Sequence, residues 1–389
     1  MPGDRLTAAV ELGSPGAPPD AVAHGSVDTG HQIGREVHAL LDGRVSRAAA
    51  YGPSFSLLWE MSSRCAQGGK LLRPRLLVDA FDAMVVEATI DPARRGIALR
   101  IAAAVEILHF SFLLHDDVID DDLLRRGAPN LIGELILQQG SGVTGGDVPA
   151  GLQATRNHLH WARSNGILVG DVMLSLAHQV FARQPLPEGI RVRLLDLLDH
   201  AITESVAGEH ADVGLSDGIM PAELSAVLEM TRLKTATYTF ELPLRAAAVL
   251  AESGPRTEAA IAAIARRIGV AFQLQDDLFS AFSPCLEHGK DPFSDFREGK
   301  ETAIIAYARV TSAWPSIEPR FGAVDFCEQD GILIRDLLVS CGAEEFIRSL
   351  VDEHLRAALE LVSTDDPVLP GPLVDRLLQL VDTLESRRF

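Results

Sequence analysis

Two clusters of aspartate residues lie far apart in the chain, and each follows an apolar stretch. The first occupies residues 116–122, after the apolar residues 107–114, and the second is the pair Asp276 and Asp277. Carboxylates three and four residues apart share one helical face, where like charges destabilise the helix unless something neutralises them. Mg²⁺ does so, and it is typically held by one or two carboxylates together with substrate phosphates. The pattern therefore predicts a metal-bridged diphosphate site, whose oxygen ligands suit Mg²⁺ or Mn²⁺.

Basic residues that could bind a diphosphate recur along the chain. Lys70 and Arg73 follow the glycine pair Gly68-Gly69, which lets the backbone approach a ligand closely. Lysine supplies a point charge, and arginine supplies a planar fork that matches phosphate oxygens. Each basic group alone is typical of an ordinary helix surface, but their presence beside two acidic clusters favours a phosphate site. The further candidates are Arg125, Arg126, Lys234, Thr235, Tyr238, Lys290, Lys300 and Thr302.

The composition excludes several classes of protein. The formal net charge of -19 argues against a nucleic-acid binder, which needs clustered lysine and arginine. The four cysteines lack metal-ligand spacing, so free thiols in a reducing compartment are expected. No segment reaches the roughly 18 uninterrupted apolar residues of a membrane span. The start of the chain also lacks a signal-peptide pattern, and a cytoplasmic protein without a membrane span is predicted.

The elements that must position these residues are helices. Alternating runs of β-branched residues are nearly absent, which predicts an all-α fold. Residues 1–30 are rich in Gly, Pro, Ala and Asp and are expected to be a disordered extension. Residues 31–389 are expected to form a single domain. The glycine-rich residues 138–151 and the charged residues 283–300 are typical of loops.

Taken in chain order, these motifs resemble those of the trans-isoprenyl diphosphate synthases. The resemblance covers about residues 60–303, and its specificity comes from the order of the motifs rather than from any one of them. The matching motifs are Gly68-Gly69-Lys70-x-x-Arg73-Pro74, Glu106-x-x-His109, Asp116-Asp117-x-x-Asp120, Arg125-Arg126-Gly127, Gly170-Asp171, Gly208-Glu209-x-x-Asp212, Lys234-Thr235-x-x-Tyr238, Phe272-Gln273-x-x-Asp276-Asp277, Gly289-Lys290, Asp295 and Gly299-Lys300-x-Thr302.

The resemblance implies a barrel of antiparallel helices around a central cavity, usually as a homodimer. It implies about three Mg²⁺ ions per site, bound by acidic residues of both motifs: Asp116, Asp117, Asp120, Asp276 and Asp277. It assigns isopentenyl diphosphate to one set of residues: Lys70, Arg73, His109 and Arg126. It assigns the allylic diphosphate to the remaining basic groups: Arg125, Lys234, Lys290 and Lys300.

The resemblance also implies a reaction. Loss of diphosphate from an allylic substrate leaves a carbocation, and cations stabilise the charge that develops on the leaving group. The isopentenyl double bond then attacks, and the departing diphosphate takes the final proton. The residues expected to act in catalysis are Asp116, Asp117, Lys234, Thr235 and Gln273, with Phe272 on the cavity wall near the cation.

The chain departs from the family pattern at two positions. Ser280 stands where the second motif usually ends in a third aspartate, and Glu209 stands where glutamine is more usual. Asp276-Asp277-x-x-Ser280 also half resembles a metal motif of class I terpene cyclases, which needs a later acid where this chain has Pro284. A cyclase, or a silent partner subunit of a synthase, therefore remains an alternative to a synthase.

Product length is expected to depend on the helix that carries the first acidic cluster. The resemblance implies that the growing chain runs past this helix, so that residues one turn before Asp116 form the cavity floor. One helical turn is about 5.4 Å, close to one isoprene unit. The floor residues are Ser111 and Phe112, and Leu108, one turn further back, is a second obstruction. Because Ser111 is small and Phe112 is large, we predict mainly the C20 product, geranylgeranyl diphosphate, with C15 farnesyl diphosphate as the alternative.

Overall fold

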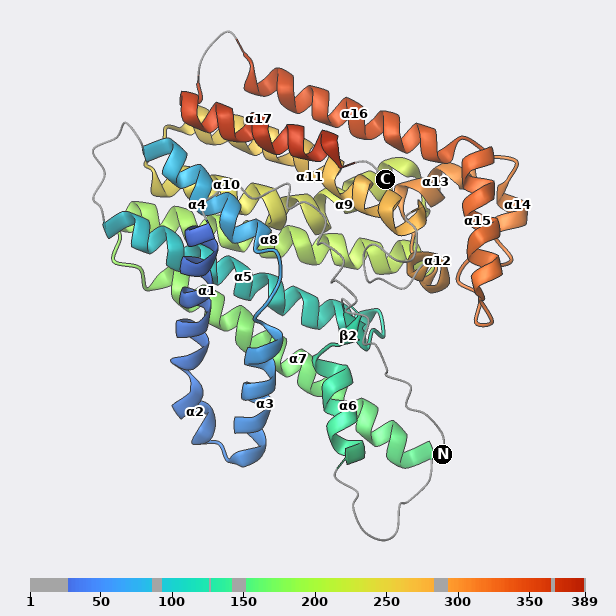
Figure 1. Cartoon of the computed structure of the whole chain (residues 1–389), viewed down its shortest axis with the longest axis horizontal. Helices are drawn as coiled ribbons and strands as arrows, with labels where there is room; N and C mark the ends of the chain where they lie inside the picture. The colour runs from blue at the N-terminus through green and yellow to red at the C-terminus, as the bar shows by residue number, and fades with distance from the viewer. Residues whose placement is uncertain are drawn as a thin grey trace, which may run out of the picture.

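Long α-helices make up almost all of the described structure (Figure 1). The structure is a computed structural model, and it describes residues 27–85, 93–125, 127–141, 152–282, 293–364 and 368–387. The elements in chain order are α1 Val27–Asp42, α2 Val45–Ala49, α3 Pro53–Cys65, α4 Leu72–Val85, α5 Ala93–Ile119, β1 Leu124–Arg125, β2 Ala128–Pro129, α6 Leu131–Ser141, α7 Leu152–Ala182, α8 Glu188–Ser216, α9 Leu224–Thr231, the π-helix η1 Arg232–Glu241, α10 Leu242–Leu250, α11 Pro255–Phe282, α12 Ser294–Glu298, α13 Ala303–Arg309, α14 Trp314–Ile317, α15 Glu328–Ser340, α16 Ala343–Val362 and α17 Gly371–Ser386. The prediction of an all-α fold is confirmed.

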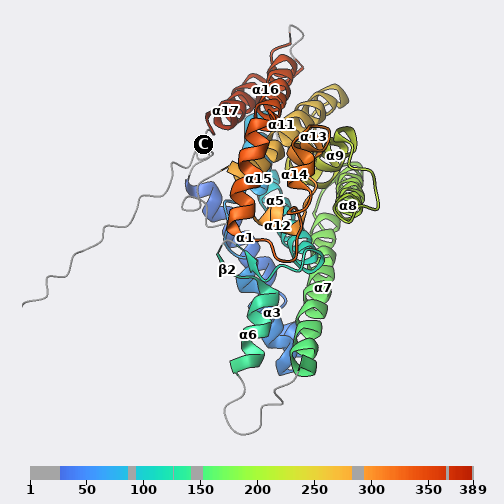
Figure 2. The same ribbon diagram turned by 90° about the vertical axis from the view of Figure 1, so that its right-hand side faces the viewer.

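Helix α5 runs through the middle of the molecule and ends in the first acidic cluster (Figure 1). It packs along α7 and also contacts α1 and α4. Residues 101–105, Ile-Ala-Ala-Ala-Val, have no exposed surface, and the small alanines let neighbouring helices approach closely. Figure 2 shows α3, α6 and the start of α7 together at one end of the molecule. The first cluster therefore lies at the end of a long helix whose middle is buried in the core.

Helix α5 is also long and apolar enough to meet the length and composition of a membrane span. However, 83% of its most apolar window is buried inside the protein. Among the described residues it is the one helix that meets these criteria, and its burial identifies it as a core helix. This agrees with the prediction that the chain has no membrane span.

Three boundaries differ from the sequence prediction. Helix α1 starts at Val27, inside the expected extension, because Ile33, Val37 and Leu41 form an apolar stripe that is buried in the core. Helix α6 includes residues 138–141 of the expected glycine-rich loop, because the two glutamines there have good helix propensity. Helix α12 interrupts the expected charged loop, where it buries Phe296. Residues 1–26, 142–151 and 283–292 lie outside the described residues.

The π-helix η1 carries Lys234, Thr235 and Tyr238 between α8 and α11. Two glycines allow both neighbours to approach it. A Cβ at Gly208 of α8 would lie 2.3 Å from the backbone nitrogen of Lys234, and one at Gly269 of α11 would lie 2.5 Å from the Ala236 Cβ. Short π-helical segments are frequent at functional sites. Backbone contact therefore sets the position of the residues that η1 presents.

Substitution of Gly208 by alanine is expected to destabilise the protein by about 1–3 kcal/mol, because the new methyl group overlaps the backbone of η1. Gly189→Ala in the same helix is the matched control, since no atom lies within 4 Å of the position of its Cβ. Alanine there should be neutral or stabilise the helix by up to about 1 kcal/mol. Chemical denaturation followed by circular dichroism measures both changes. Equal stability of the two variants would contradict the close packing of α8 on η1.

Candidate active site

The first two aspartates of the first cluster have different main partners, although the guanidinium of Arg125 also lies 3.5 Å from Asp116. Successive residues of a helix are about 100° apart, so Asp116 and Asp117 cannot share one face. Asp116 lies 3.1 Å from the ammonium of Lys234 in η1. Asp117 is buried, with its side chain 3% exposed, and accepts a hydrogen bond from Nε of Arg125 at 2.9 Å. The first acidic cluster therefore contributes side chains to two neighbouring sites, one around Lys234 and one around Arg125.

The first site, which we call the acid–lysine cluster, contains Asp116, Asp120, Glu209, Asp212, Lys234 and Lys300. The ammonium of Lys234 lies 2.8 Å from Glu209 and donates a hydrogen bond to Asp212 at 2.6 Å. Lys300 lies 3.4 Å from Asp120. The cluster thus brings together side chains from four parts of the chain: the end of α5, α8, η1 and the segment after α12.

Charge pairing in this cluster determines its protonation. Burial raises the pKa of Asp116, but Lys234, Lys300 and Arg125 outweigh it and hold this pKa below its usual range. Burial lowers the pKa of Lys234, yet Asp116, Asp212 and Glu209 raise it well above its usual range. The Asp116 carboxylate and the Lys234 ammonium are therefore both charged at neutral pH.

The donor atoms of the cluster fit a divalent cation. Ligand oxygens of Asp116, Asp120 and Glu209 all lie within 4.8 Å of one another. Asp212 Oδ1 and Glu209 Oε1 are buried and have no hydrogen-bond partner among the described residues. Hard carboxylate oxygens are the ligands that Mg²⁺ and Mn²⁺ prefer. The residues present are therefore suited to hold the metal that the sequence predicted, with Glu209 added to the set.

The second acidic cluster lies on α11 and is linked to the first by charge. Asp277 accepts a hydrogen bond from Nε2 of Gln273 at 2.8 Å. Burial raises the pKa of Asp277 to about 8, and the nearby charge of Asp295 adds to this rise. Lys300 acts in the opposite direction on Asp277, and it also favours the ionised forms of Asp116 and Asp120. Lys300 thus interacts electrostatically with both acidic clusters.

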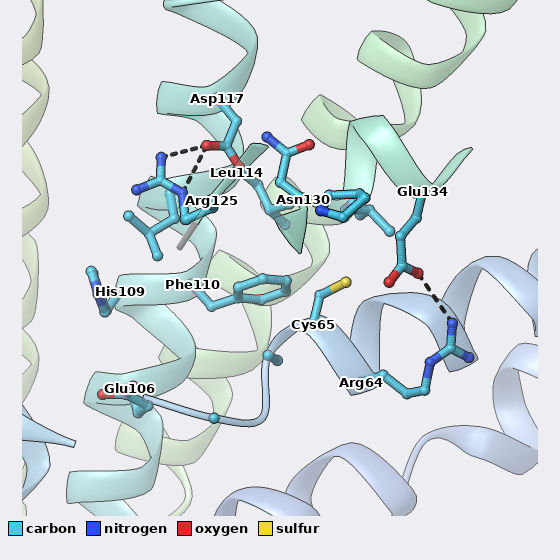
Figure 3. Close-up of a pocket in the computed structure, with 15 residues that line it drawn as sticks. Arg64, Cys65, Glu106, His109, Phe110, Leu114, Asp117, Arg125, Asn130 and Glu134 are labelled. Atoms are coloured by element: carbon cyan, nitrogen blue, oxygen red, sulfur yellow. Dashed lines mark hydrogen bonds and ion pairs between the residues drawn. The ribbon is translucent and has the colours of Figure 1, made fainter. Parts of the chain in front are cut away.

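The second site is a cavity of about 220 Å³ on the Asp117 side of α5 (Figure 3). Burial raises the pKa of Asp117 to about 6, although the adjacent Arg125 acts to lower it. Arg125 is the last residue of strand β1. It pairs with Ala128 of β2 across a tight turn that contains Gly127. The cavity is lined by Arg64, Cys65, Ala66, Gly68, Glu106, His109, Phe110, Leu113, Leu114, Asp117, Arg125, Pro129, Asn130, Leu131 and Glu134. Polar and apolar groups therefore share one small space beside the first cluster.

The glycine–lysine–arginine motif lies at the start of α4. Gly68 and Gly69 have φ angles of 111° and 127°, a backbone conformation that favours glycine. Lys70 is exposed. Arg73 donates a hydrogen bond to the hydroxyl of Tyr238 at 2.9 Å and stacks 4.6 Å above its ring. Tyr238 therefore joins this motif to η1, which also carries Lys234.

The predicted chain-length residues have three different environments. Leu108 and Ser111 have no exposed surface, and the Ser111 hydroxyl donates a hydrogen bond to the carbonyl oxygen of Gly170 in α7 at 2.8 Å. Phe112 packs edge-on against Tyr238 with ring centroids 5.1 Å apart. Phe112 therefore contacts η1 directly. Arg126 and Lys290, two predicted diphosphate ligands, lie outside the described residues.

Sequence reasoning omitted Glu209 and Asp212 from the candidate site residues. Their signal was available, because the two acids are three residues apart on α8 and share its face. It also omitted Arg387 at the end of α17. The Arg387 guanidinium lies 5.1 Å from the ring centroids of both Phe272 and Phe279 on α11, beside the second acidic cluster.

The fold and these two sites define an all-α protein whose acidic and basic side chains are suited to hold a metal ion together with an anionic ligand. The polyprenyl synthetase family model matches residues 56–316, more than half of the chain. The chain therefore belongs to the polyprenyl synthetase family and is a trans-isoprenyl diphosphate synthase.

Individual relatives agree with this assignment. The chain is 27% identical to a geranylgeranyl diphosphate synthase of Methanosarcina mazei, over 83% of this chain and 87% of the relative. It is 26% identical to a short chain isoprenyl diphosphate synthase of Methanothermobacter thermautotrophicus, over 84% and 90%. A geranylgeranyl pyrophosphate synthase from Corynebacterium glutamicum, solved with isoprenyl diphosphate and magnesium, superposes with a TM-score of 0.82. That structure has 25% identity and covers 93% of this chain and 99% of its own.

These comparisons identify the protein as a short-chain trans-prenyltransferase. They favour neither a terpene cyclase nor a silent partner subunit. The matched part of the chain includes both acidic clusters and η1.

Proposed function

We propose that this enzyme condenses isopentenyl diphosphate with an allylic diphosphate and releases mainly the C20 product. The observation that carries the product length is the contact between Phe112 and Tyr238, one helical turn before Asp116. We propose that these two aromatic side chains, packed edge to face, form a bulky floor beneath the growing product chain. Relatives named geranylgeranyl synthases support the same length.

The acid–lysine cluster is the proposed binding site of the allylic diphosphate. The bound Mg²⁺ supplies Lewis-acid stabilisation of the charge that develops on the leaving diphosphate. Asp116 and Asp120 are suited to hold that ion. Asp276 and Asp277 lie on α11, where Asp277 interacts with Lys300 of the same cluster, and are the proposed further ligands. Lys234 and Lys300 add positive charge that the protein itself positions, which costs no reorganisation during the reaction. We propose about three ions per site, in keeping with the two acidic clusters.

The cavity beside Asp117 and the α4 motif form the proposed isopentenyl diphosphate site. His109 lines the cavity, and Lys70 and Arg73 belong to the α4 motif. Arg125 also lines the cavity, although the resemblance assigned it to the allylic diphosphate. Because Arg125 also lies 3.5 Å from Asp116, we propose that it stands between the two diphosphate sites. The Arg125–Asp117 pair holds the guanidinium in a fixed orientation before substrate arrives. Thr235 and Gln273 are proposed to face the carbocation with Phe272, whose ring can stabilise positive charge. The departing diphosphate is the proposed base for the final proton.

We further propose that the enzyme acts as a homodimer in the cytoplasm. The described cysteines, Cys65, Cys327 and Cys341, are free thiols, which suits a reducing compartment. The burial of α5 supports a protein without a membrane span.

Product analysis tests the proposed reaction. Purified protein, Mg²⁺, labelled isopentenyl diphosphate and each allylic primer are incubated, and the products are extracted directly and after phosphatase treatment. The expected result is a C20 alcohol that appears only after phosphatase treatment. A cyclic hydrocarbon extracted directly, with no elongated diphosphate, would refute condensation.

Phe112→Leu is expected to lengthen the product by at least one isoprene unit, because it removes the ring that packs on Tyr238. Phe110→Leu is the control for product length: it makes the same change on α5, but beside the proposed isopentenyl diphosphate site, so it is expected to affect turnover and not product length. Chromatography of the dephosphorylated products measures both. Ser111 is a less clean test, because a larger side chain there would meet α7. Wild-type chains of C30 or more, or unchanged length in Phe112→Leu, would show that the floor lies elsewhere.

A further inference from the structure

Glu209 is an acidic residue of the acid–lysine cluster that does not belong to either aspartate motif. Glu209 lies on α8, outside both motifs, yet its carboxylate is within 4.8 Å of ligand oxygens of Asp116 and Asp120. One of its oxygens, Oε2, pairs with Lys234 at 2.8 Å. The other, Oε1, is buried and has no hydrogen-bond partner among the described residues. A buried carboxylate oxygen without a donor is costly unless a cation or donor reaches it.

The three ion pairs of Lys234 show how the cluster is balanced. An ammonium group has three N–H donors, and Lys234 faces three acids, Asp116, Glu209 and Asp212, at 3.1, 2.8 and 2.6 Å. Asp212 is the shortest and most buried of these contacts, with its side chain 6% exposed. Asp212 is not part of the group of carboxylates that lie within metal-binding distance of one another. Asp212 therefore anchors Lys234, whereas Asp116 and Glu209 face both Lys234 and the metal position.

The formal charge of the acid–lysine cluster also favours binding of a divalent cation. Its four carboxylates face two ammonium groups, Lys234 and Lys300, when all six groups are ionised. Two negative charges remain in excess, which one divalent cation neutralises. Replacement of Glu209 by a neutral residue would halve that excess. Coulomb attraction for a metal ion in a partly buried site depends strongly on such a difference.

We propose that Glu209 is a third carboxylate ligand of the metal ion held by Asp116 and Asp120, with Asp212 retaining Lys234 beside it. This inference rests on the proposed metal site of the enzyme and assigns to it a residue outside the two aspartate motifs. Helix α8 then contributes directly to metal binding as well as to packing around η1.

The test is Mn²⁺ binding to the full-length, metal-free protein, measured by electron paramagnetic resonance with and without inorganic diphosphate. Glu209→Gln keeps the shape of the side chain but removes its charge. It is expected to raise the Mn²⁺ dissociation constant roughly tenfold or more. Asp116→Asn should have at least as large an effect, because Asp116 belongs to the same group of ligands.

Glu204→Gln is the matched control. Glu204 lies on the same helix and pairs with a cation of η1, Arg232, at 2.9 Å. Its side chain is 22% exposed, against 21% for Glu209. Loss of an α8–η1 ion pair is therefore common to both variants, and Glu204→Gln should bind Mn²⁺ like the wild type.

The outcomes separate the inference from the metal site itself. Unchanged Mn²⁺ binding in Glu209→Gln, with weakened binding in Asp116→Asn, would overturn the role of Glu209 alone. Unchanged binding in both variants would overturn the whole metal site. Equal weakening in Glu209→Gln and Glu204→Gln would show that helix packing, rather than metal ligation, is responsible. Weakening confined to Glu209→Gln and Asp116→Asn would support the inference.

Discussion

Replacement of Asp116 by asparagine is expected to lower kcat by two or more orders of magnitude while the protein stays folded. Asp116 is held ionised by its cationic neighbours and faces the proposed metal position. Removal of one group that stabilises developing charge typically costs about 10²–10³ in kcat. The fold should tolerate the change, because Lys234 keeps Glu209 and Asp212 as partners. Steady-state kinetics and a melting curve measure the two effects.

Asp121→Asn provides the control for this prediction. Asp121 belongs to the same acidic cluster, but its side chain is 67% exposed and pairs with Arg163 of α7. Surface pairs of this kind contribute little, about 0–1 kcal/mol. This variant should therefore keep both kcat and the melting temperature. Near-normal turnover of Asp116→Asn with Mg²⁺ would remove Asp116 from the catalytic site.

Lys234→Met is expected to impair both activity and stability. Lys234 balances three acids, one of which, Asp212, has a side chain that is 6% exposed. Removal of one partner of a buried ion pair leaves an uncompensated charge and costs about 3–5 kcal/mol. The upper part of this range is not expected here, because the Lys234 side chain is itself 19% exposed. Chemical denaturation in EDTA measures the loss, and kinetics with Mg²⁺ should show a large fall in kcat.

Arg232→Met separates this effect from general damage to η1. Arg232 lies two residues earlier in the same π-helix and pairs with Glu204 and with Glu229, whose side chain is 58% exposed. Its loss should cost less than the loss of Lys234 and leave turnover unchanged, because Glu229 is largely exposed and Glu204 keeps a hydrogen bond from Thr237. If Lys234→Met were as stable as the wild type in EDTA, the acid–lysine cluster would not be a balanced charge network. Loss of Asp116 is thus expected to reduce activity alone, whereas loss of Lys234 is expected to reduce both activity and stability.

Local sequence patterns predicted much of the site because several of its parts are local. The cluster that starts at Asp116 and the pair Asp276–Asp277 could be recognised as acidic groups on helical faces without any tertiary information. The glycine pair before Lys70 was expected to let the backbone approach a ligand closely, and Gly68 and Gly69 both have positive φ angles, which glycine adopts readily. In each case the deciding contact lies within a few residues along the chain.

Helix boundaries were less predictable. Glycine-rich composition suggested a loop from residue 138 onward, but α6 continues to Ser141. The extension expected up to residue 30 is helical from Val27, because its apolar stripe is buried in the core. Composition reports average preference, whereas burial of an apolar face decides where a helix begins and ends.

The sequence by itself determined that this protein is helical, and it predicted that two acidic clusters, with basic partners, bind a metal–diphosphate substrate. Only the tertiary structure decided which acids meet. It turned Asp117 away to Arg125 and brought Glu209 from α8 into contact with Lys234. The physical reason is that such contacts depend on the packing of helices that are distant in the chain. Here that packing depends on Gly208 and Gly269, which let α8 and α11 approach the backbone of η1.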